Sequence, residues 1–197
     1  MMKVNSQELA TLGYTIKWLE YGILSAEQLK VDLAEFQKDD GDPNIEHYRY
    51  RTAMNFLRGK TQWIDEEVEH LLEVVAEDPD GDMSRSVALA LLKCDTLTDQ
   101  QFYKLNEHPA IKVLDVSKAH LRHDLLRFLT RESLAPQVID RCIQEGDSTV
   151  HGRLLEFEDL PIDAVQALST CGANKAIRNM AAQRLQSKRH RKPDSKR

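Results

Sequence analysis

The fold of this chain is decided by residues 78–92, which read DPDGDMSRSVALALL. A turn-forming segment is followed by apolar residues at Met83, Val87 and Leu91, and this spacing of four places them on one face of a helix. The pattern begins again at Val113, Val150 and Ile177, with a small or apolar residue four positions on in each copy and a leucine eight positions on in all but the Val150 copy. Because it returns after 30, 37 and 27 residues, about the length of a supersecondary unit, it predicts a stack of helical hairpins.

The rest of the chain shows helical spacing and helix-capping signals. Ser25 and Thr98 each have a glutamine three positions on, so each can form a capping box that starts a helix. Further helices are predicted in residues 7–20, 45–58, 65–77, 84–94, 109–129, 134–144, 150–156, 160–170 and 174–186. Alternating apolar residues are scarce outside these segments. The sequence therefore predicts an all-α fold, a short and irregular superhelix of antiparallel helix pairs.

Composition indicates a soluble globular chain. The 197 residues are 41% hydrophobic and 30% charged, and no apolar run approaches the roughly 18 residues that span a bilayer. The first residues mix charged with apolar side chains, unlike a secretory signal, so we expect a cytoplasmic protein. We expect a single all-helical domain over residues 1–186, with N-terminal helices in 1–60 and repeats in 61–186. The three cysteines are expected to be buried free thiols: Cys94, Cys142 and Cys171.

Two segments carry the marks of a known repeat. Asp78 and Pro79 form a turn, and Arg85, Val87 and an alanine-rich helix follow it; Ile177-Arg178, with Ala181 and Ala182, keeps the same order. These segments resemble HEAT and armadillo-like repeats, helical stacks that bind proteins or nucleic acids on a curved surface. The resemblance covers roughly residues 65–186, although the copies at Val113 and Val150 lack the Asp-Pro turn and have Leu114 and His151 in place of the arginine. It implies a HEAT-like binding surface and no particular chemistry.

The strongest charge feature is the acidic stripe, which consists of Glu66, Glu69, Glu73 and Glu77. These residues lie three or four apart and so share one face of the predicted helix. Residues 62–84 contain no lysine or arginine, and like charges at this spacing destabilise a helix slightly, which favours a partner of opposite charge. Our first hypothesis is a non-enzymatic protein-interaction module, such as an adaptor, an inhibitor or immunity protein or an assembly factor, whose acidic stripe binds a basic partner. The alternative for the stripe is solvation or internal pairing with Arg51, Arg58 and Lys60.

A basic terminus supports a second hypothesis, nucleic-acid binding. Residues 187–197 carry a charge of +5, and because the whole chain carries −5, the other 186 residues carry −10. This tail is expected to be disordered, and a solubilising role is its alternative. The residues proposed to bind phosphates are Arg51, Arg58, Lys60, Lys188, Arg189, Arg191 and Lys192.

A third hypothesis is a metal-dependent phosphohydrolase. His123-Asp124 resembles the adjacent ligand pair of the all-helical HD-type family, in which a metal activates water. The resemblance implies further ligands upstream and downstream, for which the candidates are His70, His108, Asp159 and Asp163. Arg122 stands where that family has an apolar residue, which weakens the match.

Other chemical signatures are incomplete or absent from the sequence. Asp78, Asp80 and Asp82 alternate like calcium-loop ligands, but Met83 and Leu89 occupy the positions of the required glycine and glutamate, so Asp82 is expected to cap a helix. No phosphate-binding loop, nucleophile elbow or paired-cysteine ligand set occurs. We therefore expect no catalytic residue, no metal and no cofactor.

Overall fold

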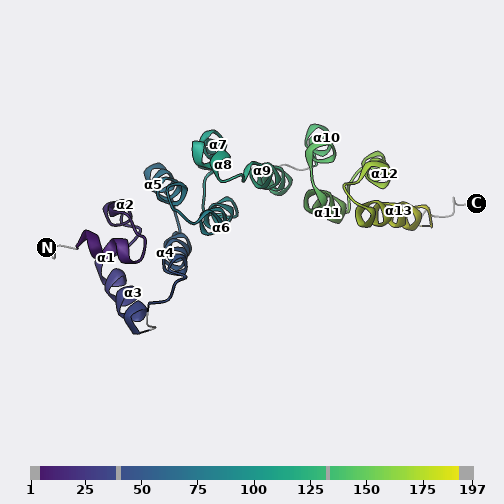
Figure 1. The fold of residues 1–197 in the computed structure, drawn as a ribbon. Helices are drawn as coiled ribbons and strands as arrows, with labels where there is room; N and C mark the ends of the chain where they lie inside the picture. The colour runs from purple at the N-terminus through teal and green to yellow at the C-terminus, as the bar shows by residue number, and fades with distance from the viewer. Residues whose placement is uncertain (1–4, 39–40, 132–133, 191–197) are drawn as a thin grey trace, which may run out of the picture. The chain divides into compact units, whose positions relative to one another are not determined.

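The computed structural model describes residues 5–38, 41–131 and 134–190. In these ranges the chain forms thirteen α-helices and no strand (Figure 1), so the predicted all-α fold is confirmed. The first eight are α1 (Ser6–Thr11), α2 (Ile16–Glu20), α3 (Ala26–Lys38), α4 (Glu46–Arg58), α5 (Asp65–Ala76), α6 (Gly81–Leu92), α7 (Asp99–Glu107) and α8 (Pro109–Val113). The other five are α9 (Ser117–Arg131), α10 (Pro136–Glu145), α11 (Ser148–Glu156), α12 (Ile162–Cys171) and α13 (Lys175–His190). Within the described ranges no helix is both long and apolar enough to cross a membrane.

The chain divides into two compact units, Met1–Ser117 and Lys118–Arg197. In the first unit α5 packs against α6 and α8, and α4 packs against α6. α2, α5 and α7 follow one another along one side of this unit, and α4 and α6 lie along the other (Figure 1). Its largest fully buried side chains are Trp18, Tyr48 and Phe102. These aromatic side chains supply much of the apolar area that holds the short helices together.

The second unit is built from stacked helical hairpins. α10 and α11 form one hairpin and α12 and α13 the next, and α10 contacts α12 while α11 contacts α13. Their common core includes Val150, Leu154 and Leu168, together with Cys142. Cys142 is a buried free cysteine as predicted, and burial raises the pKa of its thiol to about 11. Cys94 is only partly buried and Cys171 is exposed, so the prediction that all three are buried is wrong. This arrangement is compatible with a helical repeat.

Three of the four copies of the apolar pattern point into a core. Met83, Val87 and Leu91 are buried, and so are the leading residues of the copies at Val150 and Ile177. The copy at Val113 is different, because this side chain is 72% exposed. Its pattern does not lie on one helix: α8 ends at Val113, and Asp115 adopts a φ of 51° before α9 begins. The turn buries Leu114 and Val116 instead, so the prediction of an inward-facing Val113 is wrong.

Helix boundaries differ from the prediction at three further places. The helix predicted over residues 7–20 is interrupted at Gly13, whose φ is 73°. Asp80, and not Asp82, caps α6, because its side chain accepts a hydrogen bond from the Met83 amide at 2.7 Å. α13 continues to His190, past the predicted end at Gln186, and the remaining tail residues, 191–197, lie outside the described residues.

A buried ion pair fixes the first unit around α5. Arg49 of α4 donates to both carboxylate oxygens of Asp78, Nε to Oδ2 at 2.6 Å and Nη2 to Oδ1 at 3.1 Å. Both side chains are nearly inaccessible to solvent, at 3% and 1% exposure. Nη1 donates to the Leu12 carbonyl at 2.7 Å, and a Cβ on Gly13 would collide with this guanidinium. Arg49 thereby joins the segment before α2, the helix α4 and the turn that follows α5.

Candidate functional site

The acidic stripe lies on α5, whose other side is buried. The buried residues of this helix are Val68, Leu71, Leu72, Val74 and Val75. The helix begins where the Glu67 side chain accepts from the Ile64 amide at 3.2 Å. Glu66 and Glu69 are exposed, and neither makes a hydrogen bond or ion pair within the described part of the chain. The first half of the stripe is therefore open to solvent.

The second half of the stripe is paired internally. Lys17 of α2 donates to Glu73 Oε1 at 2.7 Å and to Glu77 Oε1 at 2.6 Å, and the Tyr21 hydroxyl donates to Glu73 Oε2 at 2.8 Å. The Tyr21 ring also stacks on His70, with centroids 3.7 Å apart. The hydrogen bonds from Lys17 and Tyr21 lower the pKa of the Glu73 carboxyl. The partner is thus α2, and none of Arg51, Arg58 and Lys60 pairs with the stripe.

A groove runs beside the stripe between α5 and α8, and we call it the α5–α8 groove. It has a volume of about 370 Å³. Its α5 wall is formed by Glu69, Glu73, Ala76 and Glu77, and its α8 wall by His108, Pro109, Ala110 and Val113. The groove therefore combines carboxylates on one wall with small and apolar side chains on the other.

His108 stands at the end of the groove nearer to α7. Its Nδ1 accepts a hydrogen bond from the Ala110 amide at 3.2 Å, so it caps α8 in its neutral form. Burial lowers the pKa of His108, and the negative charges of Glu69 and Glu73 act in the opposite direction. Acceptance at Nδ1 places the ring proton of the neutral imidazole on Nε2. At neutral pH the charge of the groove is therefore set by its glutamates and by Lys17.

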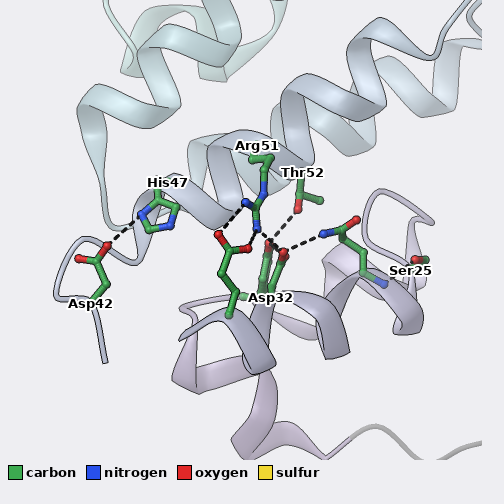
Figure 2. Close-up of polar contacts among 9 residues, drawn as sticks. Ser25, Asp32, Asp42, His47, Arg51 and Thr52 are labelled. Carbon is green, nitrogen blue, oxygen red and sulfur yellow. Dashed lines mark hydrogen bonds and ion pairs between the residues drawn. The ribbon is translucent and has the colours of Figure 1, made fainter. Parts of the chain in front are cut away.

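One of the residues proposed for nucleic-acid binding, Arg51, is held inside the first unit. Figure 2 shows the Arg51 guanidinium against Asp32: Nη2 donates to Asp32 Oδ1 at 2.6 Å and to Glu35 Oε2 at 2.8 Å. Asp32 is fully buried and also accepts from the Tyr14 hydroxyl at 3.1 Å, which in turn contacts Thr52. These contacts give Arg51 a structural role between α3 and α4.

The other proposed phosphate-binding residues are scattered. Lys60 forms an ion pair with Glu67 and lies over the Phe56 ring at 4.4 Å. Arg58 is exposed and makes no hydrogen bond or ion pair among the described residues. Lys188 and Arg189 fall in the last turns of α13, where side chains are not described, and Arg191 and Lys192 lie outside the described residues. Among the side chains of this set that the structure describes, those of Arg51, Arg58 and Lys60, no basic cluster is brought together.

The proposed phosphohydrolase ligands do not form a metal site in the described ranges. No group of three histidine, cysteine, aspartate or glutamate side chains there could hold a metal ion. Asp124 is buried and its Oδ2 accepts from Arg141 Nη2 at 2.8 Å. Of the aspartates compared with a calcium loop, Asp78 is bound by Arg49 and Asp80 caps α6. These carboxylates are thus used by arginine and by the backbone.

Three residues were not assigned to this surface from the sequence: Lys17, His108, which was considered only as a metal ligand, and Val113, which was expected to face the core. Lys17 is separated from Glu73 by 56 residues, so no local spacing could reveal the pair. The exposure of Val113 depends on the turn at Asp115, a backbone conformation that the apolar pattern does not encode. Comparison of the chain with protein-family models, with curated proteins and with solved structures gives no match.

Proposed function

We propose that this chain is a non-enzymatic protein-interaction module that binds a basic partner protein through the acidic side of α5. The observation that carries this proposal is that one half of the acidic stripe is paired with a cation and the other half is not. Glu73 and Glu77 are held by Lys17, while Glu66 and Glu69 are exposed without an ion-pair partner in the described part of the chain. Like charges three residues apart on a helix destabilise it slightly, and a bound cation removes that penalty.

Charge supports a basic partner over a nucleic acid at this surface. The chain outside residues 187–197 carries −10, which repels phosphates and attracts cationic proteins over several ångströms. Electrostatic complementarity of this kind raises association rates and selects partners by sign. A HEAT-like module that offers a surface to an adaptor, inhibitor or assembly complex agrees with the stacked hairpins, and no step of chemistry is needed.

The ion pairs of Lys17 determine which glutamates can be changed to test this proposal. Changing Glu73 or Glu77 would also disturb the contact with Lys17, so the informative variant is Glu66→Gln with Glu69→Gln. A matched control removes two exposed carboxylates elsewhere, Glu27→Gln with Asp140→Asn. Tagged proteins are used to recover partners from an extract of the native host, with quantitative mass spectrometry and circular dichroism on each variant.

We expect at least one protein with a basic surface segment to be recovered by the unchanged chain and by the control variant, and to be depleted with the Glu66/Glu69 variant. Two exposed ion pairs of about 0.2–1 kcal/mol each correspond to a loss of roughly 2- to 30-fold in affinity. Helicity should be unchanged in all three proteins. Equal recovery by all three would refute the proposal, and so would recovery of nucleic acid in place of a basic protein.

A further inference from the structure

We propose that the α5–α8 groove receives a helical segment of the partner protein, and that this segment carries two lysines or arginines one helical turn apart beside an aliphatic side chain. This inference rests on the proposed function and specifies where and how the partner binds. It follows from the composition of the two walls, which differ from each other in chemistry.

The α5 wall sets the number and spacing of the cations. Glu69 and Glu73 are four residues apart, about 6 Å along the helix axis, and Glu77 continues the same line. These three carboxylates and the ammonium of Lys17 together carry two negative charges. Lys104, the other cation that acts on Glu69, is balanced by its ion pair with Asp65. Lysine or arginine side chains four residues apart on a second helix have the same spacing. Two cations on one helical turn therefore match this wall in charge and in distance.

The α8 wall requires an apolar group. Val113 is 72% exposed although it is aliphatic, and Pro109 beside it is also exposed. Ala76 and Ala110, one from each wall, are small and allow a helix to approach closely. Lys112, the cation nearest in sequence, is exposed but is not one of the residues that line the groove. An aliphatic side chain of the partner would remove the Val113 surface from water.

An amphipathic helix satisfies both walls at once. In this recognition mode one face of a helix lies in a groove, and residues at positions i, i+3, i+4 and i+7 make the contacts. A nucleic acid brings phosphates to a wall that carries two negative charges, and a bilayer cannot enter a groove of this size. The fit therefore specifies a basic amphipathic helix of another protein.

Photocrosslinking from single positions of the full-length chain tests this inference. The photoreactive residue benzoylphenylalanine replaces Val113 in the groove, Ile64 at the start of α5 outside the groove, or Ile162 in the second unit. All three positions carry exposed aliphatic side chains, so the substitutions are matched in exposure. The three proteins are irradiated in an extract of the native host, and the crosslinked peptides are sequenced by mass spectrometry.

We expect crosslinking from position 113 to a peptide with two lysines or arginines three or four residues apart next to an aliphatic residue. Adding Glu69→Gln to this protein should reduce the yield of the crosslink by roughly 1.5- to 5-fold, because one exposed ion pair with the partner is lost. Adding Glu27→Gln should leave the yield unchanged. Position 162 should give no such peptide.

Three results would overturn the inference. Crosslinks from position 64 but not from 113 would leave the proposed function standing and place the partner outside the groove. Crosslinks from 113 to residues 187–197 of this chain, to a nucleic acid or to a peptide without paired cations would identify a different occupant. If neither position 113 nor position 64 gives a crosslink whose yield depends on Glu69, both the groove as a binding site and the proposed function are rejected.

Discussion

Arg49 shows how a single buried side chain positions the acidic surface. Its guanidinium binds Asp78 just beyond α5 and the carbonyl of Leu12 just beyond α1. At the surface, Lys17 and Glu73 join α2 to α5. The sequence spacing around Arg49 does not show that this arginine is buried, because its partners Asp78 and Leu12 are remote from it in sequence.

Replacing Arg49 should therefore lower the free energy of unfolding of the first unit more than replacing an exposed residue of the same helix. Arg49→Ala leaves the carboxylate of Asp78 buried without its partner, and we expect a loss of about 3–5 kcal/mol in the free energy of unfolding. Arg58→Ala, an exposed change on α4, should stay within about 0.5 kcal/mol. Urea denaturation followed by circular dichroism measures both. A loss for Arg49→Ala as small as that for Arg58→Ala would contradict the structural role.

Gly13 provides a second test at the residue scale. Gly13 and Gly22 have similar φ values, 73° and 67°, but only at Gly13 would a Cβ meet Arg49. Gly22→Ala should cost about 1–2 kcal/mol for the left-handed backbone alone. Gly13→Ala should cost more, because the collision adds to the same backbone penalty. Thermal denaturation of both variants checks the order, and equal losses would show that the guanidinium moves aside freely.

At the scale of helices, the contact between α2 and α5 depends on pH. The pKa of Glu73 is lowered in the folded chain, so its contribution to stability is complete above its unfolded pKa of about 4.3 and is lost as the pH falls through the folded value. Between pH 7 and pH 3 the unchanged chain should lose about 0.2–1 kcal/mol more than Glu73→Gln, the usual range for an exposed ion pair. Urea titrations at both pH values measure the difference.

Glu69→Gln is the matched control for this pH dependence, because Glu69 lies on the same face without an ion-pair partner in the described part of the chain. Its pH dependence should remain that of the unchanged chain. If Glu73→Gln and Glu69→Gln behave alike, Lys17 does not hold α5 in solution.

Sequence patterns predicted helices well where one helix carried the whole pattern. The copies at Met83, Val150 and Ile177 form core faces because each lies within a single helix. The capping box at Thr98 forms as expected, since the backbone N–H of Gln101 donates to Thr98 Oγ1 at 3.2 Å. The copy at Val113 failed because a turn divides it. The acidic stripe was identified correctly as a face of one helix, but its internal partner, Lys17, is remote in sequence and could not be inferred from spacing.

At the scale of the whole molecule, the second unit has a hydrophobic core of its own. The buried members of the cluster around Cys142, Val150, Leu154 and Leu168 all lie between Leu125 and Ala181, within this unit. We therefore expect a fragment of residues 117–197 to be helical and to unfold cooperatively on heating, as a compact domain does. Circular dichroism and calorimetry test this, with Leu154→Ala as a variant that should lower the midpoint. A fragment without a cooperative transition would show that the unit depends on the rest of the chain.

Binding of a basic partner by α5 is decided by the recovery of partner proteins with two variants: the chain with Glu66→Gln and Glu69→Gln, and the chain with Glu27→Gln and Asp140→Asn. We expect a basic protein to be depleted by roughly 2- to 30-fold only in the first variant, with helicity unchanged in both. Equal recovery of every partner by the two variants would contradict it.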